Sequence, residues 1–315
     1  MSPTISHTTS SFLADDPRVE DAIERIAERL ADHGDPVLPL AEERALLAAL
    51  SEFDLGRFLV LNGGLSGYWT SYVFTHDGMT AATELERWLL QHSTLAGIRQ
   101  RYERLSDLVA ARLRPGRRVA SVPCGVMDDM LRQPDALLAG VSVIGADIDD
   151  ESLGLAAQLA ERRGVSDRVQ LRRADAWDLD LGEPVDLLLS NGLNIYESDR
   201  ERLVALYRRF HDNLVPGGEL LVSYIPPLPP PPASSPVAAR IWASLGMSVD
   251  DVRRDRAIFG DLLSAKYLNV TSTDELTAQL REAGLSLREV HFSEYGVLPI
   301  AVATRPLTDR APGRP

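Results

Sequence analysis

The sequence predicts an α/β fold in which a helical region precedes a mostly parallel sheet. After residue 116, short β-rich runs alternate with helical stretches, which is typical of parallel strands joined by crossover helices. Residues 15–115 instead carry apolar residues at helical spacing. The last two β-rich runs are separated by a turn around Gly296, so a final hairpin should place the last strand antiparallel to the rest.

Helices are expected through most of residues 15–115. In DPRVEDAIERIAERLADH, the side chains of Val19, Ile23, Ile26 and Leu30 recur on one helix face. Further helices are predicted in AEERALLAALSE, TELERWLLQH and GIRQRYERLSDLVAARL. The stretch RFLVLNGGLSGYWTSYVF (57–74) mixes glycines, hydroxyls and aromatic residues and does not fit a simple helix.

The strands are predicted in RRVASV, VSVIGAD, RVQLRRAD, VDLLLSN and GELLVSYI, followed by LSLREVHFSEY and VLPIAVATRP. Two helices among them carry end signals. Ser198 with Glu201 predicts a capping box, and Ser272 with Glu275 opens a helix that Gly284 closes. The buried stripe expected on the first of these helices consists of Leu203, Leu206, Phe210 and Leu214.

The length of 315 residues favours one large domain with an appendage, or two domains. We expect a flexible leader (1–14), a helical cap for substrate or dimerisation (15–115), an α/β domain (116–306) with an insertion (226–270), and a flexible tail (307–315). The proline-rich segment 226–236 can be neither helix nor sheet interior, because proline lacks the N–H donor. A stiff connector is expected there, with partner binding as the alternative.

The composition excludes several classes of protein. A net charge of -13 argues against binding to phosphate backbones, and no run is apolar enough for a membrane span. Cys124 is the single cysteine, and no clustered Cys and His residues suggest a metal site. A cytoplasmic protein is expected, and it could form a homodimer.

Residues 118–149, RVASVPCGVMDDMLRQPDALLAGVSVIGADID, form the most informative stretch of the chain. They predict a strand, a tight turn, a helix and a second strand that ends in the carboxylate of Asp147. In α/β folds, such a unit holds an adenosine, because the loop backbone approaches the ligand and the acid accepts the ribose hydroxyls. The usual glycines of the loop are largely replaced here by other residues, among them Pro123 and Met127.

Over residues 99–304, the order of these pieces resembles the class I S-adenosylmethionine-dependent methyltransferases. The best match is VDLLLSNGLNIYESDRERLVALYRRFHDNLVPGGELLVSYI (185–225), above all VPGGELLVS. The resemblance implies a Rossmann-like, seven-stranded, mostly parallel sheet with an antiparallel last strand, and an N-terminal helical cap over the carboxyl ends of the strands. It also implies S-adenosylmethionine as the cofactor.

The same resemblance implies a set of cofactor-binding residues. Gly125 and the backbone of Pro123 and Cys124 would lie under the methionine portion, and Asp147 would accept the ribose hydroxyls. The adenine would be contacted by Ile148, Asp175, Ala176 and Trp177. Asn191 would lie beside the sulfonium and the amino-acid end, which Tyr102 and Arg101 could reach. The alternatives are a helix cap for Asp147, a core position for Trp177, a turn for Asn191, a structural role for Cys124, and an exposed helix face for Arg101 and Tyr102.

The loop departs from the family pattern in its charge as well. Ser121 stands where the family usually has an acidic residue that helps hold the ammonium of the cofactor. Pro123 and Met127 replace two glycines, and proline removes a donor. Asp128 and Asp129 could supply the missing negative charge, or could only cap the following helix.

The expected reaction is methyl transfer to an oxygen or carbon of a small acceptor. Asn194, Tyr196 and Glu197 follow the fourth strand, where catalytic or substrate-facing residues are expected. Tyr68, Trp69 and Tyr72 are the expected acceptor-binding residues, with a helix contact or dimer interface as the alternative. Because the loop is altered, a non-methylating reaction such as cyclisation, or a non-catalytic partner subunit, is the alternative function.

Overall fold

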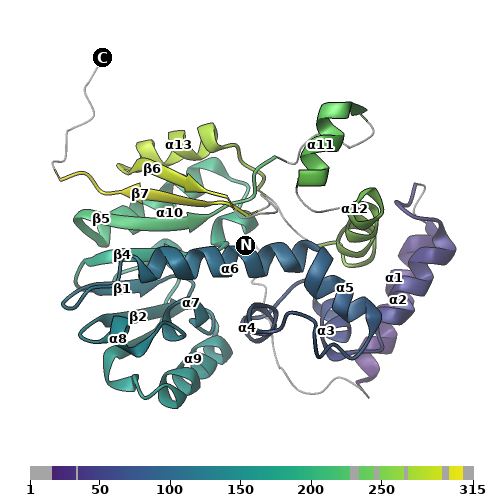
Figure 1. Ribbon diagram of the computed structural model, residues 1–315, viewed down its shortest axis with the longest axis horizontal. Helices are drawn as coiled ribbons and strands as arrows, with labels where there is room; N and C mark the ends of the chain where they lie inside the picture. Colours follow the sequence, from purple (N-terminus) through teal and green to yellow (C-terminus); the bar gives the residue numbers. More distant parts are fainter. Residues whose placement is uncertain are drawn as a thin grey trace. The chain divides into compact units, whose positions relative to one another are not determined.

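The computed structural model describes residues 16–32, 35–227, 234–244, 248–265, 269–292 and 298–307 (Figure 1). These residues form two compact units. The helical unit comprises the described residues of Met1–Gln100 and Leu228–Lys266. The sheet unit comprises those of Arg101–Pro227, Tyr267–Ser293 and Val297–Pro315. The predicted leader and most of the predicted tail lie outside the described residues, as do the core of the proline-rich segment and the turn around Gly296.

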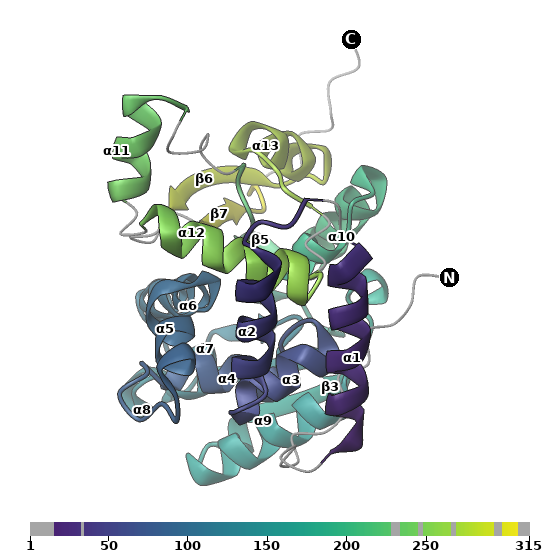
Figure 2. The ribbon, with the colours of Figure 1, turned by 90° about the vertical axis from the view of Figure 1, so that its right-hand side faces the viewer.

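The helical unit contains the helices predicted near the N-terminus. Its elements are α1 (Pro17–Asp32), α2 (Leu40–Leu50), α3 (Asp54–Asn62), α4 (Gly67–Thr75), α5 (Glu84–His92) and the first residues of α6 (Thr94–Ala110). Helices α1 and α2 lie side by side and both pack on α3 (Figure 2). The apolar stripe predicted for α1 is confirmed in part, since Val19, Ile26 and Leu30 are buried together with Ala22.

The prediction that the stretch 57–74 is not a simple helix is confirmed, because it contains parts of two helices, α3 and α4. Helix α3 ends at Gly63, which has a φ of 65°, a conformation that favours glycine. Ser66 then caps α4, and its side chain accepts a hydrogen bond from the N–H of Trp69. A Cβ on Gly63 would lie 2.9 Å from the carbonyl oxygen of Leu263, so a larger residue would not fit this turn.

The insertion after the fifth strand belongs to the helical unit. It contains α11 (Pro236–Ser244), α12 (Val249–Arg256) and the π-helix η5 (Ala257–Leu262). The half-buried carboxylate of Asp255 accepts hydrogen bonds from the N–H and the hydroxyl of Thr94, at 2.7 and 2.8 Å. Asp251 accepts the indole N–H of Trp88 at 2.8 Å. The insertion therefore supplies acceptors that the N-terminal helices need.

The sheet unit holds seven strands in the order β3-β2-β1-β4-β5-β7-β6. They are β1 (Arg118–Ser121), β2 (Ser142–Asp147), β3 (Val169–Arg173), β4 (Val185–Ser190), β5 (Leu214–Ser223), β6 (Ser286–His291) and β7 (Ile300–Thr304). Strand β7 is antiparallel to both of its neighbours, and the pairs among β1 to β5 are parallel. The predicted α/β fold, with seven strands and an antiparallel last strand, is confirmed.

Helices cover both faces of this sheet. Helices α10 (Arg200–Asp212) and α13 (Thr273–Glu282) bury their apolar residues against one face of the sheet, in a core that includes Ile144, Leu188 and Val222. Helices α6, α7 (Asp128–Leu131) and α9 (Asp150–Arg162) cover the other face. The remaining short elements are α8 (Asp135–Leu138), η1 (Ser166–Arg168), η2 (Ala176–Asp178) and η3 (Leu193–Tyr196). Alternate residues of the five inner strands thus face opposite cores, as a buried sheet requires.

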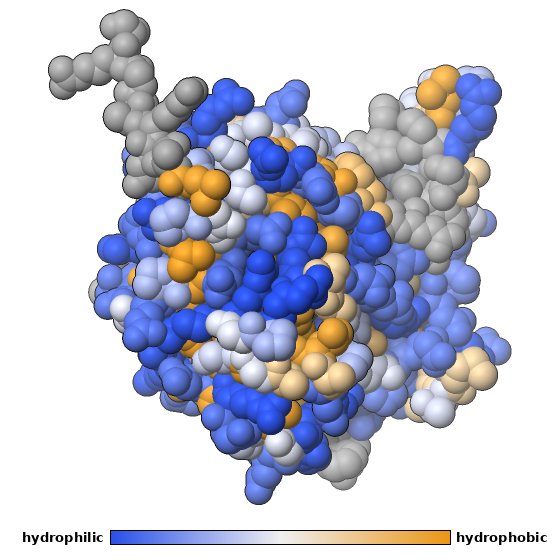
Figure 3. Space-filling model, turned by 60° about the vertical axis from the view of Figure 1, so that its left-hand side comes forward, coloured by the Kyte–Doolittle hydropathy of each residue, from blue (hydrophilic) through white to orange (hydrophobic). Residues whose placement is uncertain are grey.

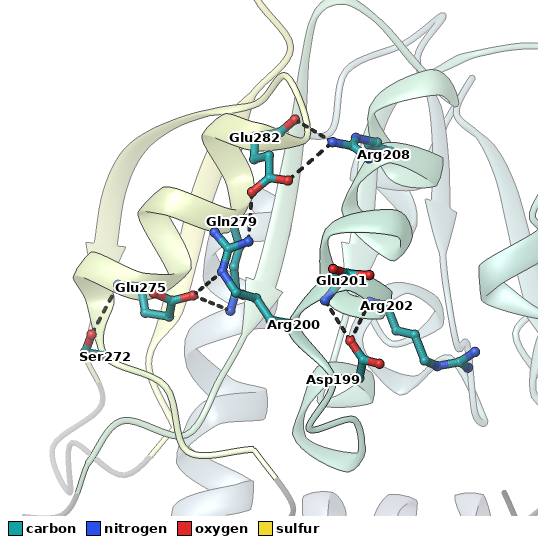
Figure 4. A network of polar contacts seen from close by, with 9 residues as sticks. All are labelled: Asp199, Arg200, Glu201, Arg202, Arg208, Ser272, Glu275, Gln279 and Glu282. Atoms are coloured by element: carbon teal, nitrogen blue, oxygen red, sulfur yellow. Dashed lines mark hydrogen bonds and ion pairs between the residues drawn. The ribbon is translucent and has the colours of Figure 1, made fainter.

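The predicted start of α10 was wrong by one residue. The N-cap is Asp199, whose carboxylate accepts hydrogen bonds from the N–H groups of Glu201 and Arg202, so Ser198 does not form the capping box (Figure 4). A carboxylate at this position is favoured by the helix dipole. Leu214, predicted on the stripe of this helix, is buried but begins β5.

The predicted end signals of α13 are confirmed. Ser272 accepts a hydrogen bond from the N–H of Glu275 at 3.1 Å, and Gly284 follows the helix with a φ of 88°. On the outer side of the sheet unit, Arg200 of α10 pairs with Glu275 and Glu282 of α13 (Figure 4). These ion pairs are half-exposed and contribute little beside the buried contacts between the two helices.

The face of the molecule in Figure 3 is mostly hydrophilic, with hydrophobic residues in small separate groups. Within the described ranges, no helix is both long and apolar enough to cross a membrane. The same ranges contain no group of three or more His, Cys, Asp and Glu side chains placed to hold a metal ion.

Candidate functional site

Asp147, the last residue of β2, is the centre of the candidate site. Its side chain is 7% exposed and accepts hydrogen bonds from the N–H groups of Gly125 (2.8 Å) and Asp149 (3.0 Å). Burial raises the pKa of this carboxyl, and the two backbone donors oppose the rise. Asp149, not Asp147, caps α9 by accepting the N–H groups of Glu151 and Ser152. The cap alternative for Asp147 is therefore wrong.

The loop after β1 is hydrogen-bonded to the carboxyl end of β2. The N–H of Cys124 bonds to the carbonyl of Ala146, and Gly125 bonds to the carboxylate of Asp147. A Cβ on Gly125 would meet no heavy atom within 4 Å, so this side of the loop is open. Burial raises the pKa of the Cys124 thiol, which agrees with a structural role and not with a nucleophile.

Met127 adopts a backbone conformation that favours glycine. Its φ of 62° lies in the left-handed region, and it forms the N-terminal boundary of α7. The side chain fits because β2 has a glycine beneath it: a Cβ on Gly145 would lie 2.5 Å from the sulfur of Met127 and 3.1 Å from that of Cys124. The glycine of the strand therefore compensates for the large residues of the loop.

The turn after β4 brings several predicted residues to the carboxyl end of the sheet. The side-chain oxygen of Asn191 accepts the hydroxyl of Ser223, at the end of β5. Asn194 is buried, and its amide donates to the hydroxyl of Tyr207. Glu197 pairs with Arg202 of α10. These contacts give Asn194 and Glu197 structural partners in the sheet unit.

Tyr196 is the most exposed of the three predicted catalytic residues, at 46%. Desolvation raises the pKa of Tyr196, an effect that the nearby Arg101 opposes. Arg101 itself is only 6% exposed, and a Cβ on Gly192 would lie 3.2 Å from its guanidinium. The exposed-face alternative for Arg101 is therefore wrong, and Gly192 makes room for this cation at the turn.

Asp129, in the first turn of α7, is a second buried carboxyl at this end of the sheet. Burial and then the neighbouring Asp128 raise the pKa of Asp129 to about 7, while Arg101 lowers it. Tyr102 lies close to the same acids, and its burial raises its pKa to about 12. Helix α6 and the loop after β1 thus bring a buried cation and a buried acid together.

The residues predicted around the adenine lie at the ends of β2 and β3. Ile148 is 50% exposed and Asp175 is exposed, whereas Ala176 is buried. Trp177 is half-buried: it packs on the core, donates its indole N–H to the carbonyl of Arg202, and has the Arg202 guanidinium 5.1 Å from its ring. These contacts favour the core alternative for Trp177.

The comparisons with known proteins agree with this geometry. The family model described as a methyltransferase domain matches residues 120–218. The solved structure of a possible exported protein from Bordetella parapertussis is similar at 34% identity and a TM-score of 0.83, over 97% of this chain and 100% of that one. Magnesium protoporphyrin IX methyltransferase from Synechocystis PCC 6803 shares the fold at 16% identity and a TM-score of 0.51, over 76% of this chain and 94% of that one. No curated protein matches the chain.

The domain match and the sheet order decide the family. The chain belongs to the class I S-adenosylmethionine-dependent methyltransferase superfamily. The predicted membership is thus confirmed. In the loop after β1 of this superfamily member, Gly125 and Met127 both have left-handed conformations.

The predicted acceptor-binding residues lie in the helical unit. Trp69 is buried and contacts the ring edges of Tyr68 and Tyr72, at 5.1 and 5.2 Å between ring centroids. The hydroxyl of Tyr72 donates to the buried carboxylate of Glu86 at 2.9 Å. Tyr72 thus contacts other residues of the helical unit through its hydroxyl and its ring. The side chain of Tyr68 is partly exposed. Their role toward an acceptor stays a prediction.

Reasoning from the sequence missed Gly145 and gave Asp129 only an alternative role. Gly145 lies inside the β-rich run VSVIGAD, and a glycine within a strand is a signal of close approach by another group. Asp129 could not be separated from Asp128 by sequence: both acids are buried, and only the structure shows that Asp128 pairs with Arg132.

Proposed function

We propose that this member of the superfamily transfers the methyl group of S-adenosylmethionine to an oxygen or carbon of a small molecule. The observation that carries the proposal is the buried carboxylate of Asp147 at the tip of β2, held by the loop after β1. In a parallel sheet, ligands bind at the carboxyl ends of the strands, where the strand order reverses. Here the order reverses between β1 and β4.

The residues at this edge fit the chemistry of an adenosyl cofactor. Asp147 would accept the ribose hydroxyls, as a charged acceptor at a strand tip can do. The open side of Gly125 would admit the ligand to the loop backbone, where a side chain would obstruct it. Ile148, Asp175 and the backbone of Ala176 would contact the adenine. The proposed set is completed by Ser121, Pro123, Cys124, Trp177, Asn191 and Tyr102.

When bound, S-adenosylmethionine supplies an electrophilic methyl group on a sulfonium. The chain's own residues then have to position the acceptor and exclude water, because in-line displacement depends on orientation. Among the predicted catalytic residues, Tyr196 is the best placed, since its hydroxyl lies near the cation of Arg101 and its ring is partly exposed. Asn194 and Glu197 would hold the turn through Tyr207 and Arg202.

Calorimetric titration with S-adenosylhomocysteine tests the cofactor site. Asp147→Asn is expected to weaken binding about 10- to 100-fold, because two charge-assisted hydrogen bonds become neutral ones. Asp149→Asn is the matched control: it neutralises an acid two residues away and keeps a good helix cap, so binding should be close to wild type. Equal affinity of Asp147→Asn and the wild type would contradict the site.

A reaction on the same bound cofactor without methyl transfer is the second candidate. It is favoured by the contacts of Asn194 and Glu197, which leave the turn after β4 with few groups for proton transfer. Incubation with methyl-labelled cofactor and candidate acceptors separates the two. Label in the product supports methyl transfer, and an unlabelled new product supports the second candidate.

Assembly, localisation and acceptor binding are also proposals. We expect a small-molecule acceptor contacted by Tyr68, Trp69 and Tyr72, a homodimer, and a cytoplasmic protein. Export is the competing expectation, because the Bordetella relative is described as a possible exported protein. Cell fractionation of the native host and light scattering of the purified chain would decide these points.

A further inference from the structure

The turn that carries Tyr196 has weak hydrogen bonding of its own. The 3-10 helix η3 spans four residues, Leu193–Tyr196, and begins after Gly192, which has a φ of 90°. Its backbone contributes a bond from the N–H of Glu197 to the carbonyl of Asn194, which is long at 3.4 Å. A single helical turn is unstable in isolation, because it fixes several backbone dihedrals for one hydrogen bond. Contacts from other elements therefore decide where Tyr196 lies.

The segment before α13 supplies two of these contacts through Asn269. The backbone N–H of Asn269 donates to the carbonyl of Ile195 at 3.1 Å, and its side-chain amide donates to the carbonyl of Asn194, also at 3.1 Å. These two carbonyls belong to the residues that directly precede Tyr196 in the chain. The side-chain bond is partly buried, where a carbonyl without a partner is costly. Asn269 thus fixes the backbone immediately before Tyr196.

The same segment is attached to the end of β5. The N–H of Thr271 donates to the carbonyl of Ile225 at 2.9 Å, and Thr271 is buried. The hydroxyls of Tyr224 and Thr273, the latter in the first turn of α13, are hydrogen-bonded at 2.7 Å. Since β4 and β5 are paired strands, the segment bridges the end of β5 and the turn after β4. Asn269 is therefore anchored to the strand next to the turn that it holds.

Tyr196 is the best placed of the predicted catalytic residues, and its position depends on this turn. We propose that Asn269 is a positioning residue that acts through Tyr196, because its two donors keep the Tyr196 hydroxyl where the methyl acceptor is bound. In-line displacement is sensitive to orientation, and a misplacement of about 1 Å can cost on the order of 100-fold in rate. The inference rests on the proposed function, and it extends the active site to the segment before α13.

Three variants separate the amide donor from the volume of the side chain. Asn269→Ala removes the side chain, whereas Asn269→Asp keeps its shape and cannot donate while the carboxylate is ionised. Val270→Ala is the matched control, because Val270 is adjacent, 55% exposed and takes no part in either bond. All three should bind S-adenosylhomocysteine with unchanged affinity, which shows that the sheet unit is folded.

Fluorine NMR of protein labelled with fluorotyrosine reports the position of Tyr196. Its signal, assigned by its loss in Tyr196→Phe, should move toward the unfolded position in both Asn269 variants and stay in place in Val270→Ala. Lowering the pH should return the signal of Asn269→Asp toward that of the wild type, because a protonated carboxyl donates a hydrogen bond again. Asn269→Ala should show no such recovery.

Methyl transfer gives a second readout, with the acceptor that the labelled cofactor identifies. Asn269→Ala should lower kcat about 10- to 100-fold and leave KM little changed. In the Tyr196→Phe background the same change should cost less than about twofold, since the group that Asn269 positions is already absent.

A Tyr196 signal that coincides with that of the wild type in both Asn269 variants would overturn the inference. So would losses in kcat that multiply in the double variant, or a loss of S-adenosylhomocysteine binding in Asn269→Ala, because either gives Asn269 a role that does not act through Tyr196. Absence of methyl transfer by the wild type would instead contradict the proposed function, and the fluorine signal would still decide whether Asn269 positions Tyr196.

Discussion

Asp147 and Asp129 are buried carboxyls with different surroundings. Asp147 receives two backbone N–H groups, one from Gly125 and one from Asp149, which stabilise its charged form against the effect of burial. Asp129 lies beside another acid, Asp128, and burial dominates its titration. The first arrangement suits a permanent hydrogen-bond acceptor. The second makes ionisation of Asp129 unfavourable.

Neutralising Asp129 should stabilise the ligand-free protein. A carboxyl whose pKa rises from 3.8 to about 7 on folding makes the folded state bind more protons than the unfolded state between these pH values, so stability falls as pH rises through that window. Asp129→Asn removes this loss, and should raise the free energy of unfolding near pH 8 by on the order of 1–4 kcal/mol. The gain should vanish below about pH 4.

Urea unfolding between about pH 4 and pH 8 measures this effect. Glu24→Gln, a change at an exposed residue of α1, is the control and should give no pH-dependent gain. A variant less stable than the wild type at every pH would show that the Asp129 carboxylate stabilises the free protein, against the prediction.

At the scale of elements, the sequence predicted the strands and most helices correctly because their signals are local. Alternation of β-rich and helical runs, and the apolar stripe of α1, depend on neighbours within a few residues. The start of α10 was missed because Ser198 and Asp199 are both good caps, and sequence does not say which one adopts the extended backbone before the helix.

This difference between Ser198 and Asp199 can be measured. Asp199→Ala should lower the free energy of unfolding by about 1 kcal/mol, because two N–H groups in the first turn of α10 lose their acceptor. Ser198→Ala should change it by less than about 0.5 kcal/mol. Thermal or urea unfolding of the two variants decides the point, and a larger loss in Ser198→Ala would favour the original assignment.

At the scale of the whole chain, the insertion after β5 joins the unit formed by the first hundred residues. The carboxylates of Asp255 and Asp251 accept hydrogen bonds from Thr94 and Trp88, respectively. The guanidinium of Arg29 donates to the carbonyls of Asp261 and Leu262. The sequence indicated an insertion but not its partners. Contacts between residues more than a hundred positions apart leave no periodic signal.

Replacing residues 236–262 by a short Gly-Ser linker should loosen the helical unit. Amides of α5 and of the first turn of α6 are expected to exchange with solvent about tenfold faster or more, because their side-chain partners are lost. The double variant Asp251→Asn, Asp255→Asn keeps the chain length and should produce part of the effect. Hydrogen exchange followed by mass spectrometry measures both, and unchanged rates in the linker variant would show that the insertion does not support these helices.

The sequence by itself determined the fold class, the antiparallel direction of the last strand and the acid at the end of β2. These follow from local spacing and from the family resemblance of residues 185–225. Only the tertiary structure decided that Gly145 accommodates Met127, that Asp149 and not Asp147 caps α9, and that Arg101 and Asp129 are buried together. Such contacts join separate elements, and their geometry depends on how the loops and helices pack at the carboxyl edge of the sheet.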